Sequence, residues 1–251
     1  MILANALRIL YPTRCPGCGS ILTVKTDKDR IEHTGNPYIC EKCYAEIDFL
    51  EGRRRCRRCS KPLEKGDRIL CPDCAGKSRE FTRGVSMMLH GPIARSAIYD
   101  IKYNDLKCNA AFLGAEAARR LGKEVASFGA EVMIPVPLGK KRQRERGYNQ
   151  AEVLARAFRQ EAEKKGIKLP PIDAEYLARV KATKALKEMS GAERREAVSG
   201  AFAVKGRPGK YKRVLVIDDI FTTGSTISEC AKALKAAGAQ EVFFMTFSIG
   251  S

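Results

Sequence analysis

The chain has 251 residues, of which 44% are hydrophobic, and its formal net charge is +17. This composition is typical of a globular protein, and the absence of any run of eighteen apolar residues predicts no membrane-spanning helix. The basic charge predicts anionic partners such as phosphate ligands or nucleic acid, although lysine-rich helix faces alone would also produce it. An apolar run at residues 1–12 contains Arg8 and ends at Pro12. It favours a short docking helix over a signal peptide, and with it a cytoplasmic location.

The cysteines divide the chain into two parts. Eight of the ten lie within the first 74 residues, and only Cys108 and Cys230 follow. The break predicts a small cysteine-rich module over residues 1–80 and a larger domain over residues 81–251, which is long enough to bury a core. The two late cysteines are expected to be buried thiols rather than nucleophiles.

Four Cys-x-x-Cys pairs predict that the module binds two structural zinc ions. A tight turn directs both thiolates of a pair to one ion, and two pairs complete a tetrahedral shell with no open position. Disulfides would require an oxidising compartment, and four pairs are too many for a redox dithiol. We expect consecutive pairs to share an ion, although the spacing also permits an interleaved arrangement. The expected ligands are Cys15, Cys18, Cys40 and Cys43 in the first site and Cys56, Cys59, Cys71 and Cys74 in the second.

A cluster of five arginines occupies the run from Arg53 to Arg58. So many guanidinium groups on a metal-stiffened surface suit contacts with nucleic-acid phosphates. The same charges would also offset a thiolate-rich zinc site. Few aromatic residues lie nearby, so sequence-specific reading of bases is not predicted.

Strands and helices are predicted to alternate in the larger domain. This pattern indicates an open, parallel α/β sheet with right-handed crossovers, in which ligands bind at the carboxyl ends of the strands. In chain order we expect an apolar run at 84–90, helices at 93–103 and 110–121, a strand at 132–138, a helix at 149–165, a strand at 214–217, a helix at 226–237 and a strand at 241–247.

One strand end carries the residues of a sugar-phosphate site. Residues 214–217 lead into Asp218 and Asp219, a turn rich in hydroxyls, and a helix. The hydroxyls and the free N–H groups of the helix would hold a phosphate, while the two carboxylates would bind vicinal sugar hydroxyls. A nucleotide hydrolase is disfavoured because no Gly-x-x-x-x-Gly-Lys-Ser/Thr motif is present. The phosphate-binding residues would be Thr222, Thr223, Gly224, Ser225 and Thr226.

The run from Val214 to Thr226 resembles the 5-phosphoribosyl 1-pyrophosphate (PRPP) motif of type I phosphoribosyltransferases. The resemblance implies that Asp218 and Asp219 contact the ribose 2- and 3-hydroxyls and that the turn binds the 5-phosphate. Lys102 and Arg146 would neutralise the pyrophosphate, or they are ordinary solvated charges. A segment similar to the pyrophosphate loop of that fold contains Pro135, Val136, Pro137 and Leu138.

The order of motifs along the whole chain is similar to that of the ComF family of competence-associated proteins. The cysteine pairs come first, followed by Asp100-Ile-Lys-Tyr, the Pro-Val-Pro-Leu loop, Arg146-Gly-Tyr-Asn-Gln and the Asp-Asp motif. This resemblance implies a type I phosphoribosyltransferase-like sheet behind a zinc-ribbon head, and a role in DNA uptake during natural transformation. One segment differs: Leu186 and Ala197 replace the Gln and Asn of the mobile loop that closes over the ligand.

Two functions follow from these residues and resemblances. An enzyme would bind PRPP with Mg²⁺ and transfer its pentosyl group as pyrophosphate leaves, although no residue identifies the acceptor. A binding module would sense PRPP and engage single-stranded DNA or a DNA-uptake helicase through its basic surface. The changed loop favours the module, and the intact Asp-Asp motif favours the enzyme. His33 and His90 are expected to be ordinary surface or packing residues.

Overall fold

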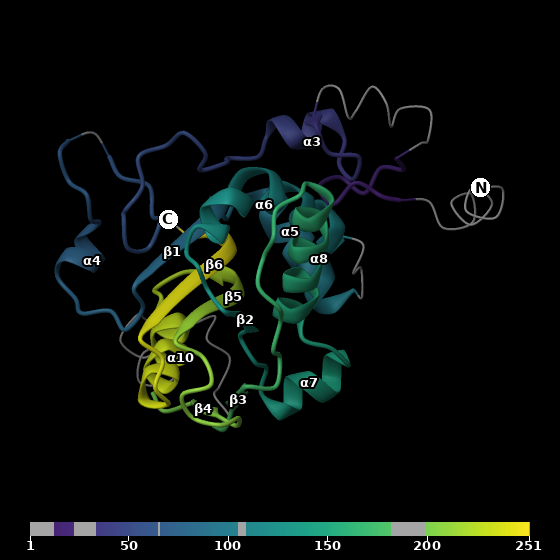
Figure 1. Cartoon of the computed structure of the whole chain (residues 1–251). Coiled ribbons are helices and arrows are strands. Elements are labelled where there is room, and N and C mark those ends of the chain that lie inside the picture. The colour runs from purple at the N-terminus through teal and green to yellow at the C-terminus, as the bar shows by residue number, and fades with distance from the viewer. Residues whose placement is uncertain (1–12, 23–33, 65, 105–108, 182–198, 251) are drawn as a thin grey trace.

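A four-stranded parallel sheet forms the centre of the molecule (Figure 1). Its strands lie in the order β1, β6, β5, β2, and each neighbouring pair is parallel, so all four carboxyl ends meet at one edge. This confirms the predicted open parallel sheet. The strands are β1 (Arg83–Leu89), β2 (Val132–Pro135), β5 (Arg213–Phe221) and β6 (Glu241–Ile249). The computed structural model describes residues 13–22, 34–64, 66–104, 109–181 and 199–250.

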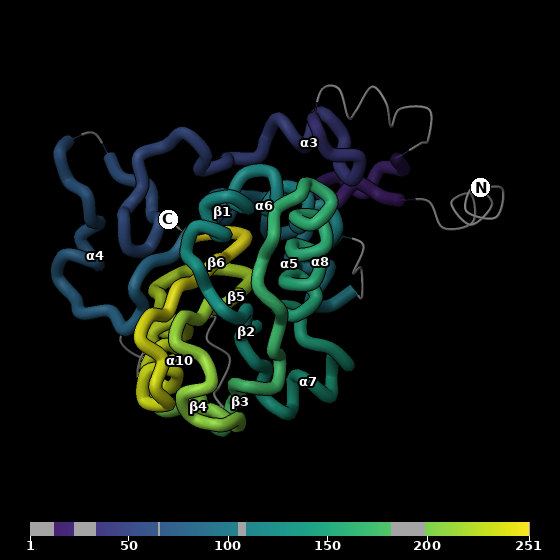
Figure 2. Tube along the Cα trace, in the orientation of Figure 1, coloured from purple at the N-terminus to yellow at the C-terminus, as the bar shows by residue number. Residues whose placement is uncertain are grey.

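Helices cover both faces of this sheet, as the tube in Figure 2 also shows. The side chains of a strand point alternately to its two faces. Leu215 and Ile217 of β5 therefore belong to one buried cluster, and Val214 and Val216 belong to another. The first cluster lies under α5 (Pro92–Tyr103), α6 (Asn109–Ala126) and α8 (Gln150–Lys164), and the second lies under α10 (Ser225–Ala236).

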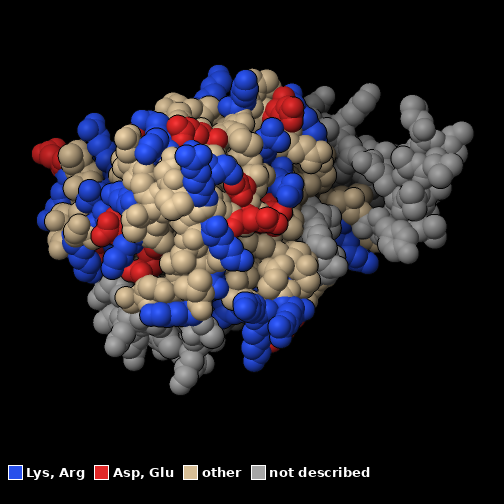
Figure 3. Space-filling view, turned by 60° about the horizontal axis from the view of Figure 1, so that its bottom comes forward, with Lys and Arg blue, Asp and Glu red and all other residues tan. Residues whose placement is uncertain are grey.

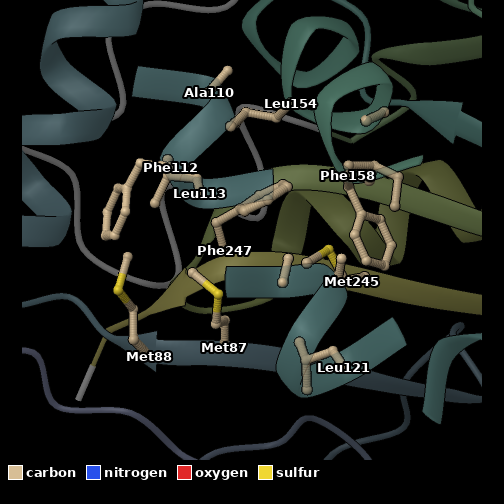
Figure 4. Close-up of a cluster of buried hydrophobic side chains, with 14 of the residues drawn as sticks. Met87, Met88, Ala110, Phe112, Leu113, Leu121, Leu154, Phe158, Met245 and Phe247 are labelled. Carbon is tan, nitrogen blue, oxygen red and sulfur yellow. The ribbon is translucent and has the colours of Figure 1, made fainter. Parts of the chain in front are cut away.

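The larger core lies between the sheet and helices α5, α6 and α8 (Figure 4). Phe112 of α6 and Phe158 of α8 are completely buried there, together with Met245 and Phe247 of β6. Each such side chain contributes about 1.5–3 kcal/mol when it leaves water. This packing fixes α5 and α8, whose ends reach the carboxyl edge of the sheet.

Three elements of the larger domain were not predicted from the sequence. Helix α7 (Lys140–Arg146) has no buried residue, so it lacks the apolar periodicity that reveals a helix. Strands β3 (Leu177–Arg179) and β4 (Phe202–Val204) form a separate antiparallel pair of three residues each, too short to give a pattern.

Two predicted strands, β2 and β5, differ most from their predicted ends. β2 ends at Pro135, so the rest of the predicted strand is a loop, in which Pro137 has no N–H to continue a ladder. β5 continues to Phe221, so Asp218 and Asp219 lie within the strand rather than after it. Their side chains therefore project from an ordered ladder.

The cysteine-rich module covers the free edge of β1. The backbone N–H of Leu89 donates to the carbonyl of Asp48 at 2.8 Å, and that of Gly84 donates to the carbonyl of Arg58 at 2.9 Å. An exposed strand edge is open to pairing with other chains, and this contact closes it. The domain boundary at residue 80 stays a prediction.

Several predictions concern the chain ends and isolated residues. Cys230 in α10 has no exposed surface, as expected for a buried thiol. Among the residues placed in the structure, no helix is both long and apolar enough to cross a membrane. The docking helix at residues 1–12, His33, Cys108, Leu186 and Ala197 all lie outside the described residues.

Candidate functional site

The eight module cysteines form two groups of four, and consecutive pairs share a group as predicted. The four sulfurs of each group lie within 4.8 Å of one another. In the first group the Sγ atoms of Cys15 and Cys40 are 3.6 Å apart, and in the second those of Cys59 and Cys71 are 3.5 Å apart. A tetrahedral zinc ion with Zn–S bonds of about 2.3 Å has sulfurs about 3.8 Å apart, so both groups fit zinc.

Local structure prepares both groups for a cation. Cys40 and Cys71 are the N-cap residues of α3 (Glu41–Ala45) and α4 (Pro72–Ala75). Hydrogen bonds from Ser20 lower the pKa of Cys18 to about 6, and a hydrogen bond from Cys59 lowers that of Cys74 to about 5. One thiol of each group thus ionises readily, whereas burial raises the pKa of Cys40, Cys43 and Cys71, so a bound cation is needed to hold these three as thiolates. Four cysteine ligands leave no open position, which assigns a structural role to zinc.

The paired carboxylates lie near the carboxyl edge of the sheet and differ in their surroundings. Asp219 is 3% exposed and forms an ion pair with Lys102 of α5, while its N–H donates to Oδ1 of Asp218 at 2.9 Å. Burial and the charge of Asp219 raise the pKa of Asp218 well above its usual range. Burial also acts on Asp219, but the ammonium of Lys102 outweighs it and lowers the pKa of this carboxyl. The pair therefore contains a protonatable carboxyl beside a fixed carboxylate.

The turn after β5 has the backbone of an anion site. Gly224 has φ +75°, and a Cβ added there would lie 2.6 Å from the ring of Phe221, so glycine is needed for both conformation and space. The hydroxyls of Thr223 and Ser225 are 2.7 Å apart. Helix α10 begins at Ser225, so the free N–H groups of its first turn lie beside these hydroxyls.

The predicted pyrophosphate loop runs beside the carboxylates. The N–H of Val136 donates to the carbonyl of Ile217 at 2.9 Å, next to Asp218. Asn149 holds the same residue, because its Nδ2 donates to the carbonyl of Val136 at 3.0 Å while its Oδ1 caps α8. The loop from Pro135 to Leu138 is thus fixed between β5 and α8.

A basic cavity of about 360 Å³ is lined in part by Lys102, the ion-pair partner of Asp219. Its Arg146 donates to Oε1 of Gln150 at 2.7 Å, and Nε2 of Gln150 lies 3.4 Å from Oδ1 of Asp219. The sequence predicted that Lys102 and Arg146 bind pyrophosphate. In the structure Lys102 forms an ion pair with Asp219, and Arg146 is linked to Asp219 by hydrogen bonds through Gln150. The cavity is lined by Lys102, Tyr103, Arg142, Glu145, Arg146 and Tyr148.

The sequence did not single out some residues at this edge. His90 follows β1, and its Nδ1 lies 3.0 Å from Oγ of Ser248. Burial and the charges of Arg95 and Lys102 lower the pKa of His90, which favours the neutral imidazole. Arg179 lies at the end of β3, and burial lowers its pKa. The charge of Arg142 lowers this pKa further, whereas the charge of Asp218 raises it, so both residues lie near the guanidinium. His90 could have been predicted as a site residue from the sequence, because it directly follows a strand that reads as buried in a parallel sheet.

Comparison with known proteins finds relatives over much of the chain. A family model described as Double zinc ribbon domain matches residues 6–75. "Competence protein F" of Haemophilus influenzae is 37% identical over 114 residues, which cover 45% of this chain and 47% of that protein. "DNA utilization protein YhgH" of Salmonella typhimurium is 27% identical over 219 residues, covering 84% of this chain and 89% of that protein. "Competence protein ComFC" of Streptococcus pneumoniae is 27% identical over 212 residues, covering 84% of this chain and 86% of that protein.

Among solved structures, a purine phosphoribosyltransferase from Pyrococcus horikoshii is similar with a TM-score of 0.32 and 15% sequence identity. That match covers 54% of this chain and 80% of the other. The alignment with Competence protein F spans about half of that relative, whereas YhgH and ComFC match along most of their length. The chain is therefore a homologue of the proteins named Competence protein F, ComFC and DNA utilization protein YhgH, and it carries a double zinc ribbon with two four-cysteine sites ahead of a parallel sheet.

Proposed function

We propose that the carboxyl edge of the sheet binds PRPP together with Mg²⁺, and that the protein acts in DNA uptake. The observation that carries the proposal is that three features lie on one edge of the sheet. They are the hydroxyl-rich turn at Gly224, the Asp218–Asp219 pair and the basic cavity at Lys102. These features suit a phosphate, a pair of ribose hydroxyls and a diphosphate respectively. The names of the relatives support the link to competence and DNA utilization.

Each group would have a separate task in this complex. The loop from Thr222 to Thr226 would hold the 5-phosphate, and the two carboxylates would orient the ribose ring. Lys102 would leave Asp219 for the diphosphate, because it is 20% exposed and can turn on its flexible stem. Mg²⁺, a cation that prefers oxygen ligands, would neutralise charge on the diphosphate.

Transfer of the pentosyl group is the enzymatic form of this proposal, and PRPP sensing is its alternative. Charge accumulates on the pyrophosphate as the bond at C1 breaks, and preorganised cations stabilise such charge. Arg146 and Arg142 at the cavity favour the enzyme. Leu186 and Ala197, which replace hydrogen-bonding residues of the resembled mobile loop, favour the sensor.

Calorimetry of PRPP with Mg²⁺ tests the shared step. We expect the wild type to bind. The double variant Asp218→Asn with Asp219→Asn should bind at least about a hundredfold more weakly, because the ribose hydroxyls lose both carboxyl groups as hydrogen-bond acceptors. Pyrophosphate release with a panel of bases and ammonia then separates enzyme from sensor. Absence of heat from the wild type at millimolar PRPP would contradict the proposal.

Single-stranded DNA is a second candidate ligand, and one surface favours it. Tyr99 and Tyr103 on α5 are 50% and 51% exposed, and their ring centroids are 4.7 Å apart. Arg146 lies 4.9 Å from the ring of Tyr103, at the end of the basic helix α7. Figure 3 turns the end that carries α7 toward the viewer, and on this face Lys and Arg cover more of the surface than Asp and Glu, with uncharged residues between them. Exposed aromatic rings beside cations suit stacked bases and their phosphates.

The predicted arginine cluster has partners within the protein. Arg53 pairs with Asp48, and Arg55 pairs with Glu124 at 3.2 Å. Both ion pairs are at least partly exposed and therefore weak, so the arginines can still exchange a carboxylate for a phosphate. Two basic surfaces are thus available to DNA.

Anisotropy of a labelled oligothymidylate between 50 and 200 mM salt tests both surfaces. Replacing Arg53 and Arg55 with glutamine is expected to reduce the salt slope by about 0.7 for each phosphate that the variant no longer neutralises. Alanine at Tyr99 and Tyr103 should weaken binding about tenfold with the slope unchanged, because stacking does not release counterions. The matched Tyr→Phe pair should bind like the wild type. Affinity that does not depend on salt would end this proposal.

A further inference from the structure

Arg79 connects the second cysteine group to the turn after β5. Its Nη1 donates to the carbonyl of Thr223 at 2.8 Å, although 144 residues separate the two in sequence. The same Nη1 would lie 3.3 Å from a Cβ at Gly224, so the guanidinium lies directly against the turn. The turn proposed to hold the phosphate is therefore supported by a residue from outside the sheet.

The contact positions the turn rather than forming part of the chemistry. A backbone carbonyl accepts the hydrogen bond, which leaves the N–H groups of the turn available for an anion. Within the described part of the chain, no carboxylate forms an ion pair with Arg79, and its buried Nε has no hydrogen-bond partner. The permanent positive charge of Arg79 thus lies beside the turn, where it favours an anion, although it also acts on the pKa of Asp73 and of Cys74.

The position of Arg79 depends on anchors on both sides of it. On one side, Cys74 is a buried member of the second cysteine group, five residues earlier in the chain. On the other side, Phe81 packs edge-on against Phe221 and Phe244, with ring centroids 6.1 and 4.9 Å away. The segment between Cys74 and Phe81 is therefore short and held at both ends.

We propose that Arg79 is a positioning residue for the phosphate turn, and that it couples the geometry of the second zinc site to the affinity for a sugar phosphate. The inference rests on the proposed phosphate site. Zinc in the second group fixes Cys74, the short segment then holds Arg79, and Arg79 holds Thr223 and Gly224 in the conformation that receives the anion. The turn is thereby ordered before the ligand binds, so less conformational entropy is lost on binding.

Two variants with long, unbranched side chains at residue 79 test the positioning role, with ribose 5-phosphate as the probe. In the wild type, Cζ of Arg79 lies over the ring of Phe81, 6.0 Å from its centroid. Arg79→Met keeps an apolar side chain at this position but cannot donate a hydrogen bond, and calorimetry should give an affinity about tenfold weaker than that of the wild type. Arg79→Lys, which can still donate to the carbonyl, should recover most of the loss. Arg83→Met is the control, because Arg83 pairs with Glu124 and does not contact the turn. Zinc content should stay at two ions per chain in every variant.

Two glycines inserted after Gly76, which is exposed, test the coupling to the zinc site. The insertion leaves all eight cysteines and Arg79 in place but loosens the segment, so we expect ribose 5-phosphate to bind about as weakly as it does to Arg79→Met. Adding the insertion to Arg79→Met should cause no further loss. Equal affinity of Arg79→Met and the wild type would overturn the positioning role, and an insertion without effect would overturn the coupling. If the wild type itself fails to bind, the phosphate site fails instead.

Discussion

Replacing Asp218 with asparagine is expected to raise the melting temperature at pH 7 while it weakens ribose binding. Burial and the charge of Asp219 raise the pKa of Asp218 in the folded state. An acid whose folded pKa is raised lowers stability as the pH rises above its unfolded pKa of about 4, because the folded state disfavours the charge. Asparagine removes that penalty and keeps an oxygen that can accept the 2.9 Å hydrogen bond from the N–H of Asp219.

The matched variant Asp219→Asn should have the opposite effect. The ion pair with Lys102 lowers the pKa of Asp219, so this carboxylate contributes stability above its unfolded pKa, and the contribution is lost as the pH falls through the lower folded value. Removing the charge leaves Lys102 without its partner. We expect the free energy of unfolding to fall by about 2 kcal/mol at pH 7. This fall is smaller than for a fully buried ion pair because Lys102 can turn toward water.

Thermal melts between pH 3 and pH 7 distinguish the two residues. For a domain of this size, a change of 1 kcal/mol in the free energy of unfolding shifts the melting temperature by roughly 2–4 °C. At pH 7 Asp218→Asn should melt about 2–4 °C above the wild type, and Asp219→Asn should melt roughly 4–8 °C below it. Both differences should shrink toward pH 3, where the wild-type carboxyls become protonated. If both variants shifted in the same direction at pH 7, the assignment of one protonatable carboxyl beside one fixed carboxylate would be wrong.

The strands of the parallel sheet, its main helices and the cysteine groups were predictable because their signals are local. Each Cys-x-x-Cys pair indicates half of a zinc site. Consecutive pairing, which we expected although the spacing also permitted an interleaved arrangement, is confirmed by the sulfur positions. The apolar run at Val214–Ile217 indicated a strand buried on both faces. Asn149 indicated the start of α8, where it is indeed the N-cap.

The connections around the site were not predictable because folding brings them from distant segments. Gln150 and Asp219 are 69 residues apart, and nothing local to either indicates that they meet. Helix α7 leaves no apolar pattern because none of its side chains is buried. The ion pair of Arg55 with Glu124 likewise depends on the packing of the module against α6. A sequence indicates which groups can bind a ligand, whereas the partners that tune their charges come from the tertiary structure.

Loss of the second zinc site is expected to destabilise the protein more than loss of the first. All four cysteines of the second group are buried, whereas Cys18 of the first is exposed. The second group also adjoins the segment that covers β1, since the N–H of Ser86 donates to Oγ of Ser60 at 3.1 Å. Binding of structural zinc contributes about 10–16 kcal/mol in small zinc modules, so its removal unfolds the ribbon. Unfolding this ribbon would uncover the β1 edge.

The pair Cys18→Ser and Cys59→Ser tests this asymmetry. Each variant should retain about one zinc ion per chain by elemental analysis, where the wild type holds two. Cys59→Ser should show the larger fall in melting temperature and should aggregate on warming, because an uncovered parallel strand offers unpaired N–H and C=O groups to other chains. Cys18→Ser should stay monodisperse, since β1 keeps its cover. In the wild type a chelator should release zinc in two phases, with the exposed first group losing its ion first. A single phase, or equal melting temperatures for the two variants, would mean that the edge of the sheet does not depend on the second ribbon.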